Sequence, residues 1–404
     1  MSRPAAVSGI GIVSPFGTSH DEFRDALLEG RAAIAPITAF EVRSCRTTLA
    51  ASLVGFEPTA WVPPMKLRRL DRTGVYALAA TKLALADAGA PVPAGGDETM
   101  GVVLGTSTAG GESTQAFLDA LFRGGVSSAP ALLFDSTVGN SAASLVAIEY
   151  KLRGPNITMA HKEASGLAAL VTAVDLLREQ GASSLAVGGV EAINETVFKS
   201  HDIFNVMSPA TSFSRRLAPF DTARAGFVMG EGGFVLWLEA AADSERARHG
   251  SILGVAAASA AVSLNAWPDD PEPLVATMHQ ALADAGVVPE DVSAVYASAN
   301  ATGVLDATEA RAIARVFCAA SPVVTSVKGA LGESGAAGIA ACAAAFLCGA
   351  VGWVPPIAGL TEPCAEAAAL RLASGATRAE GPVVVVNSFA SGGGLFSAVL
   401  RVGA

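Results

Sequence analysis

Cysteines and histidines come first, because thiolates and imidazoles carry much of nucleophilic and metal-binding chemistry. The chain has five of each, and its cysteines are Cys45, Cys318, Cys342, Cys348 and Cys364. None stands at the C-x-x-C or Cys/His spacings that zinc or redox sites require. We therefore expect reduced thiols in a cytoplasmic protein, with no metal and no cofactor.

Three glycine-rich stretches could bind a ligand through their backbone: GTSTAGGES (105–113), GFVMGEGG (226–233) and NSFASGGG (387–394). None reads G-x-G-x-x-G at the start of a helix, and none reads G-x-x-x-x-G-K-[ST]. A nucleotide cradle is thus poorly supported. Tight turns at which two backbones approach closely are the simpler interpretation.

One possible acid/base pair is local in sequence. His161 stands two residues before Glu163 in MAHKEASGLAAL (159–170). Residues two apart on a strand face the same side, which would bring the two side chains together. A structural histidine is the alternative, because the conformation of the connecting residues decides between them.

Composition limits the class of protein. The chain has 404 residues, of which 51% are hydrophobic and 16% charged, against roughly 25% charged in an average soluble domain. A large buried core is expected, and disorder as the main state is excluded. The 27 basic and 37 acidic residues give a net charge of −10 without a Lys/Arg block, so nucleic acid is an unlikely partner.

The elements that must position any site alternate between short apolar runs bounded by glycine and longer segments of helical period, which predicts an α/β fold with strands covered on both faces. The expected strands are 5–14, 100–107, 156–160, 183–192 and 232–240, then 251–260, 292–300, 322–329, 381–389 and 394–402. Both halves thus end in two successive strands, the last of which could lie antiparallel. The expected helices are 71–89, 115–123, 138–151, 164–180, 272–286, 304–318, 335–350 and 363–374.

Segments 164–180 and 335–350 are both mostly apolar, and each follows a strand and a tight loop. We interpret them as equivalent buried helices of an internal duplication, with the join in 241–251 and halves at 1–245 and 246–404. A linker between independent domains is the alternative. The uncharged stretch between Glu333 and Glu362 is rich in Ala and Gly and is broken by Pro355 and Pro356, so a buried helix is expected there and not a membrane span.

Five motifs in order resemble the β-ketoacyl synthases of the thiolase fold. They are VSGIGIVSPFG (7–17), YKLRGPN (150–156), PFDTARAGFVMGEGG (219–233), TSVKGALGESGAAG (325–338) and NSFASGGG (387–394), which together span nearly the whole chain. The resemblance implies a duplicated five-layered αβαβα arrangement, with two mixed sheets around buried helices.

The family's chemistry uses a cysteine at the N-terminus of a buried helix, two histidines, a lysine, and a glycine-rich loop that begins with phenylalanine. Aligned on these motifs, the cysteine position is Glu163, the histidine positions are Ser298 and Glu333, and Lys328 is retained. The loop supplies Phe389, Gly392 and Gly393. The chain's histidines, which stand at neither family position, are His20, His161, His201, His249 and His279.

These changes predict a chain that does not catalyse condensation by itself. A carboxylate that attacks a thioester would give a mixed anhydride that water cleaves readily, and the donors that stabilise an enolate are gone. Glu163 at a helix N-terminus could instead accept hydrogen bonds from free N–H groups. Two carboxylates in one apolar site repel, so we expect Lys328 to pair with Glu163, Glu333 or both.

Ketosynthase-like chains without the cysteine resemble the chain-length factors of type II polyketide synthases. The resemblance implies a heterodimer with a cysteine-bearing ketosynthase, transient contact with an acyl carrier protein, and a polyketide chain in a tunnel at the interface. The implied interface and tunnel residues are Phe134 and Asn140 in 132–140, and Asn156, Thr158 and Ala160 in 156–160. The product class, aromatic or reduced polyene, stays open.

Two rival functions remain. In one, the chain is a stand-alone synthase-like enzyme or malonyl-thioester decarboxylase that uses Glu163, and it would turn over without a partner. In the other, it is a scaffold that binds acyl-carrier or coenzyme A esters, and it would form a homodimer. The basic cluster Lys66, Arg68, Arg69 and Arg72 could contact an acidic carrier, or could simply be a solvated helix face.

Overall fold

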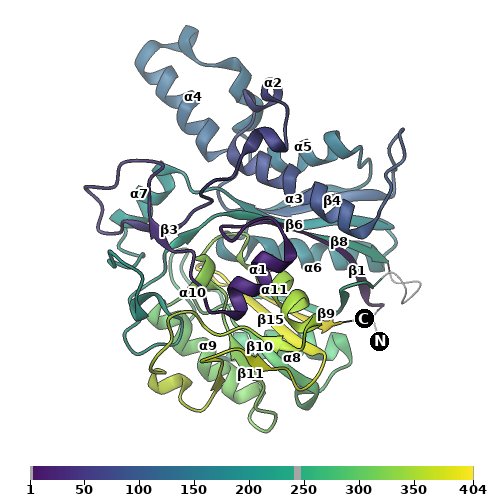
Figure 1. Ribbon diagram of the computed structural model, residues 1–404, viewed down its shortest axis with the longest axis vertical. Coiled ribbons are helices and arrows are strands. Elements are labelled where there is room, and N and C mark those ends of the chain that lie inside the picture. The colour runs from purple at the N-terminus through teal and green to yellow at the C-terminus, as the bar shows by residue number, and fades with distance from the viewer. Residues whose placement is uncertain (1–2, 241–246, 404) are drawn as a thin grey trace.

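The strands of both halves form one mixed sheet. The computed structural model describes residues 3–240 and 247–403 (Figure 1). Its main sheet has 11 strands in the order β13-β11-β10-β15-β16-β9-β1-β8-β6-β4-β5. Their bounds are β1 Ala5–Val13, β4 Met100–Gly105, β5 Asn156–Met159, β6 Ser184–Glu191, β8 Gly232–Ala240, β9 Gly250–Ser259, β10 Val292–Tyr296, β11 Val323–Thr325, β13 Arg371–Leu372, β15 Val383–Phe389 and β16 Gly394–Val402.

The strand order itself is duplicated. Counted outwards from the centre of the sheet, the first half has the order β1-β8-β6-β4-β5 and the second half the order β9-β16-β15-β10-β11. In both halves, the first strand in the chain is therefore followed in the sheet by the fifth, the fourth, the second and the third. The last two strands of each half, β6 with β8 and β15 with β16, pair antiparallel as expected.

A repeated helix end supports the duplication. Helices α3 (Arg72–Ala88) and α8 (Glu272–Ala285) both finish on Leu-Ala-Asp-Ala-Gly. The aspartates occupy equivalent places: Asp87 accepts from Ile10 N of β1 at 2.8 Å, and Asp284 from Val255 N of β9 at 2.9 Å. Each carboxylate thus fastens a helix end to the first strand of its own half.

The two halves meet in the sheet at a short seam, where β1 pairs with β9 over only three residue pairs, Ala5 to Val7 against Ile252 to Gly250. Because of this seam, the two sheets implied by the sequence form one continuous hydrogen-bonded sheet. The expected boundary between residues 245 and 246 lies in 241–246, outside the described residues, and it stays a prediction.

The helices complete five layers (Figure 1). Helices α3 and α5 (Ser141–Tyr150) cover the outer face of the first half, and α8 and α9 (Gly303–Val316) cover that of the second. Between the strand layers lie α6 (Ser165–Arg178) and α11 (Ala337–Ala350), which pack against each other. The predicted pair of equivalent buried helices is confirmed in position.

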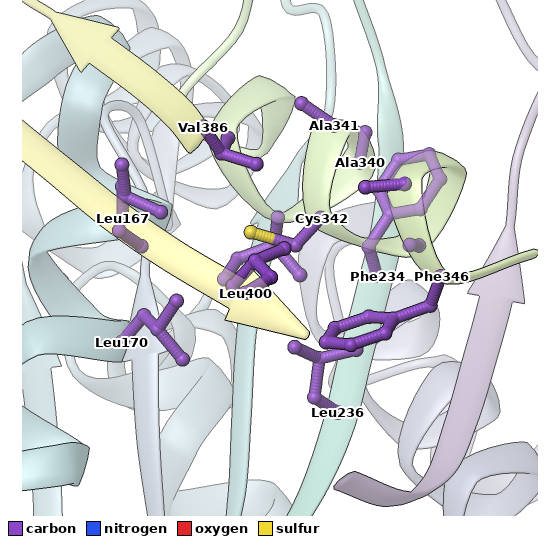
Figure 2. Close-up of a cluster of buried hydrophobic side chains, with 14 of the residues drawn as sticks. Leu167, Leu170, Phe234, Leu236, Ala340, Ala341, Cys342, Phe346, Val386 and Leu400 are labelled. Carbon is purple, nitrogen blue, oxygen red and sulfur yellow. The ribbon is translucent and has the colours of Figure 1, made fainter. Parts of the chain in front are cut away.

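The main core lies around these two helices (Figure 2). Leu167 and Leu170 of α6 meet Cys342 and Phe346 of α11, and all four are fully buried. Strands from both halves close the cluster, with Phe234, Leu236, Val386 and Leu400. Helix α11 has 14 residues and is buried over nearly its whole length. Within 3–240 and 247–403, no helix combines the length and apolarity that crossing a bilayer requires.

The remaining elements are short or peripheral. The smaller sheets contain β2 (Ala35–Pro36), β3 (Leu49–Ala51) and β7 (Met229–Gly230), and β12 (Trp353–Val354) with β14 (Thr377–Arg378). The other helices are α1 (His20–Leu28), α2 (Pro64–Leu67), α4 (Gly111–Gly124), α7 (Glu195–Ile203) and α10 (Lys328–Leu331). Short 3₁₀ helices include η3 (Ala131–Ser136), η4 (Lys162–Ala164), η7 (Pro289–Asp291) and η8 (Ala365–Ala367).

Some predicted elements are wrong. Segment 363–374 is not a helix, because only η8 forms there and the chain then extends into β13, which pairs with the edge strand β11. The strand expected at 322–329 ends at Thr325, and Lys328 begins α10. Helix α1 was missed although Ser19 and Glu22 have the spacing of an N-terminal cap, and Ser19 does accept from Glu22 N.

Helix α4 projects from the molecule beside α2 (Figure 1), and Ser113 is its only buried residue. Large apolar side chains are exposed on α4 and on the η3 region that follows. We call this set the α4 face, and it comprises Leu118, Phe122, Val126, Leu132, Phe134 and Val138. Val126 is 84% exposed and Phe122 81%. Edge strand β5 pairs only with β4, so its other side has unpaired backbone groups.

We predict that Gly105→Ala lowers the free energy of unfolding by about 1–3 kcal/mol, as overpacking of a filled core does. A Cβ at Gly105 would lie 2.1 Å from Ser165 O, where β4 passes the first residue of α6. Gly303→Ala is the control, because a Cβ there meets open space. Thermal unfolding of both variants measures the difference, and equal melting temperatures would contradict the packing argument.

Candidate functional site

The centre of the site is where the two buried helices begin. Gly166 N, at the start of α6, donates to Gly335 O, just before α11, at 2.8 Å. A Cβ at Gly166 would lie 3.0 Å from the same carbonyl oxygen, so glycine permits this approach. Glu163 precedes α6 and Glu333 precedes α11. Both glutamates therefore reach one region from opposite halves of the fold.

Glu163 lies in the 3₁₀ turn η4 between β5 and α6, and it is half-buried. Its carboxylate accepts from Ser391 N at 3.1 Å and from Ser391 Oγ at 3.1 and 3.2 Å. It forms no ion pair with any residue in 3–240 or 247–403. The idea that Glu163 caps the buried helix is wrong, because no side chain caps α6.

Lys162 fastens the same turn to the glycine-rich loop. Its backbone has a φ of 49°, the left-handed region that a residue with a Cβ rarely adopts. Its ammonium donates to Leu264 O, to Asn265 Oδ1 at 3.3 Å and to Ser391 Oγ at 3.2 Å. Ser391 therefore links both residues of the turn to the loop.

The retained lysine forms a buried ion pair. Lys328 Nζ lies 2.8 Å from Glu333 Oε2, and both side chains are at most 4% exposed. Asn300 Nδ2 donates to the same carboxylate oxygen at 2.7 Å, and Ser334 N donates to the other at 3.0 Å. The expected pairing of Lys328 is thus present with Glu333, whereas Glu163 is held by Ser391.

Burial raises the pKa of Glu333 to about 7, with Lys328 opposing this rise and the charge of Glu163 adding to it. Two further buried carboxyls lie close by. Burial raises the pKa of Glu309 to about 7 and that of Asp306 to about 6, although both accept backbone N–H groups. Burial therefore disfavours the charged form of all three carboxyls behind the site.

Ser298 connects the lysine to the glycine-rich loop. Its fully buried hydroxyl accepts from Lys328 Nζ at 3.3 Å and from Phe389 N at 2.8 Å. Phe389 is fully buried, and Gly392 and Gly393 that follow it have φ angles of 86° and 89°. The loop thus turns through conformations that favour glycine, and its Ser391 reaches Glu163.

His161 does not form the acid/base pair considered above. Its ring packs edge-on against Phe396, with 5.2 Å between ring centroids, and no hydrogen bond to Glu163 occurs among the described residues. The turn at Lys162 ends the strand alternation that the pairing needed. The structural interpretation of His161 is therefore the better one.

Glu191 is a site residue that sequence reasoning missed. It is 1% exposed and accepts from Ser107 N at 2.8 Å, from Thr108 N at 3.0 Å and from Gly335 N at 3.2 Å. It ends β6, next to the carboxyl end of the parallel strand β4, from which GTST continues. The sequence did contain a signal for this residue. One expected strand has an acidic residue near its end and another continues into a Gly/Ser/Thr run, and the carboxyl ends of parallel strands often form a binding site.

A cavity of about 470 Å³ lies above these groups. Glu163, Glu191 and Glu333 line it together with Lys162 and Ser391. Its apolar wall consists of Val197, Phe204, Val206, Phe227, Met229 and Trp267. His201, a second missed residue, also lines the cavity, and its Nδ1 lies 2.8 Å from Val197 O. None of the five cysteines lines the cavity, and all five are free thiols.

The residues expected at an interface lie elsewhere. Phe134, on η3, is 58% exposed and packs against Phe117 with 5.9 Å between ring centroids. Asn140 is exposed immediately before α5. Asn156 and Thr158 belong to edge strand β5, and exposed Ala160 follows it. These five residues are on the α4 side of the molecule or along β5, apart from the Lys328–Glu333 pair.

We predict that Lys328→Met lowers the free energy of unfolding by about 3–5 kcal/mol at pH 8, because it leaves Glu333 buried without its cation. The pKa of Glu333 in the folded protein, already raised to about 7, should rise further. In the folded variant Glu333 then keeps a proton that it loses in the unfolded chain. The free energy of unfolding of the variant therefore falls as the pH rises towards the pKa of Glu333 in the folded state. Urea denaturation should show a much smaller loss at pH 5.5.

The control for this prediction is the double variant Lys328→Met/Glu333→Gln, which has no uncompensated buried carboxylate and should recover most of the stability at pH 8. An equal loss at both pH values, or no recovery in the double variant, would show that the ion pair is not what Lys328 supplies.

Comparison with known proteins identifies the family. The model "Beta-ketoacyl synthase, N-terminal domain" matches residues 2–243, and "Beta-ketoacyl synthase, C-terminal domain" matches residues 249–361. The tetracenomycin polyketide synthase ketoacyl synthase beta subunit of Streptomyces glaucescens is 32% identical over 90% of each chain. The 3-oxoacyl-[acyl-carrier-protein] synthase 2 of Synechocystis is 30% identical over 97% of this chain and 96% of that one.

The solved structures agree. "The ishigamide ketosynthase/chain length factor" has a TM-score of 0.91 at 26% identity, with 100% of both chains covered. With the family models, this likeness establishes the thiolase-type ketosynthase fold, and the chain belongs to the β-ketoacyl synthase family.

Proposed function

We propose that this chain is a non-catalytic, ketosynthase-like subunit of the chain-length-factor kind. It pairs with a cysteine-bearing ketosynthase and shapes the tunnel that sets polyketide chain length. One observation carries the proposal: the residue at the nucleophile position is Glu163, its carboxylate is bound to Ser391, and no cysteine lines the cavity.

The chemistry of the site supports the absence of condensation. A thiolate is both a good nucleophile towards thioesters and a good leaving group in the next acyl transfer. A carboxylate would instead form a mixed anhydride that water hydrolyses. Ser298 and Glu333 also stand where the family has imidazoles, and Lys328 is engaged by both of them. Neither Ser298 nor Lys328 lines the cavity, and an ionised Glu333 has no proton to donate, so a developing enolate there would lack the two imidazole donors of the family.

The α4 face and the edge of β5 support a protein partner. Monomeric proteins rarely expose so many large apolar side chains together, and Leu132 and Phe134 are 61% and 58% exposed. An unpaired strand edge adds backbone donors and acceptors that a second subunit can use. The proposed tunnel lies at this interface, beside Phe134, Asn140 and Thr158.

An acyl carrier protein is the proposed transient partner, because it must deliver the growing chain. Lys66, Arg68 and Arg69 of the expected basic cluster are exposed, and neither arginine forms an ion pair with a residue in 3–240 or 247–403. Lys66 is paired with Glu149 at 2.6 Å, and Arg72 with Glu231 at 3.0 Å. We therefore expect Arg68 and Arg69 to make this subunit's contribution to docking of the carrier protein. The expected location of the protein is still the cytoplasm.

The central experiment is co-expression with the ketosynthase encoded beside this chain, followed by mass analysis on a size-exclusion column and a malonyl-carrier elongation assay. We expect a one-to-one complex that elongates only when both subunits are present, and Glu163→Ala should leave elongation unchanged. Turnover by this chain alone that Glu163→Ala abolishes would make it a stand-alone enzyme. A stable homodimer that ignores the ketosynthase would favour the scaffold function.

The location of the interface is tested separately. Leu132→Asp places a carboxylate in the α4 face and should weaken the complex at least tenfold, because an apolar interface leaves that charge desolvated. Val288→Asp, at a residue 54% exposed near η7, is the matched control. Equilibrium binding by biolayer interferometry measures both variants, and equal affinities would place the interface elsewhere.

A further inference from the structure

The lining of the cavity above Glu163 combines residues of two chemical kinds. Apolar side chains, with Phe204, Phe227 and Trp267 among them, offer a surface to an uncharged chain. Glu163 and Glu333 add carboxylates to the same lining. Such a combination is expected to discriminate between ligands by charge.

The cations near the cavity are already engaged. Lys162 is the one lysine or arginine among the described residues that line it, and its ammonium is bound to Leu264 O, Asn265 and Ser391. The ring of His201 also lines the cavity, with its Nδ1 2.8 Å from Val197 O. Lys328 lies behind the cavity wall, where Glu333 neutralises it. The acceptors of Lys162 are neutral, so its charge remains, but its three N–H donors are already used and none is left for an incoming carboxylate.

The glutamates differ in how their charge reaches the cavity. Backbone and hydroxyl donors enclose Glu191, and Lys328 neutralises Glu333. Among the described residues, Glu163 accepts only from Ser391, and it is half-buried at the cavity wall. A ligand carboxylate would lie close to this charge in surroundings that screen it less than water does.

We propose that this cavity is a binding site for uncharged apolar acyl chains, and that Glu163 acts as a charge filter which excludes acyl groups ending in a carboxylate. Malonyl thioesters are thereby kept from the silent site and remain for the partner. The inference rests on the proposed non-catalytic role of Glu163. Its test, however, uses this chain alone and needs no complex.

The test compares two probes: the octanoyl thioester of pantetheine, and the same eight-carbon thioester in which a carboxylate replaces the terminal methyl group. Binding to the purified full chain is followed by tryptophan fluorescence, because Trp267 lines the cavity. We expect the octanoyl probe to bind at least tenfold more tightly. Trp267→Phe should remove most of the signal change, which assigns the binding to this cavity.

The variant Glu163→Gln keeps the shape of the side chain and an acceptor for Ser391 while it removes the charge. It should reduce the affinity difference between the two probes at least threefold, whereas Glu290→Gln, the same change at an exposed distant residue, should leave it unchanged. In the unmodified chain, raising the salt concentration from 50 to 500 mM should also narrow the difference, because salt screens the repulsion.

Equal affinity for both probes would overturn the charge filter, as would an affinity difference that is as large in Glu163→Gln as in the unmodified chain. Failure of the octanoyl probe to bind would overturn the site itself. Either result would leave the co-expression assay unaffected, so the failure of this inference and the failure of the proposed function are distinguishable.

Discussion

The contact between the starts of the two central helices is the constraint on which the site depends. Gly166 and Gly335 bring these backbones within hydrogen-bond distance, and neither position has room for a side chain. Whatever residues precede the two helices must then face the same cavity. The fold thus fixes where Glu163 and Glu333 lie, and the identity of those residues decides what the cavity can do.

Two glutamates can lie beside one cavity because each has its own hydrogen-bond donors. Ser391 satisfies Glu163 without a cation, and Lys328 with Asn300 satisfies Glu333. Burial still acts on the group, since it raises the pKa of Glu333 to about 7. Both carboxylates are thus held by hydrogen bonds from their own neighbours.

Much of the fold follows from sequence because its signals are local. Strands covered on both faces give apolar runs between glycines, and the all-apolar segment 335–350 could only be buried. The helix wrongly predicted at 363–374 shows the limit of local signals. This alanine-rich segment ends in an edge strand of the sheet, because its last residues pair with β11. The motifs placed Lys328 and Glu333, but nothing in the sequence indicated that Ser391, more than two hundred residues away, would hold Glu163.

The short seam between β1 and β9 has a consequence for how the molecule unfolds. Since only three residue pairs join the halves in the sheet, their cohesion comes from the central helices. Helix α6 of the first half packs on β9 and β16, and α11 of the second half packs on β6 and β8. The core of each half therefore includes a helix from the other half, so neither half contains a complete core. We expect the chain to unfold in one cooperative step.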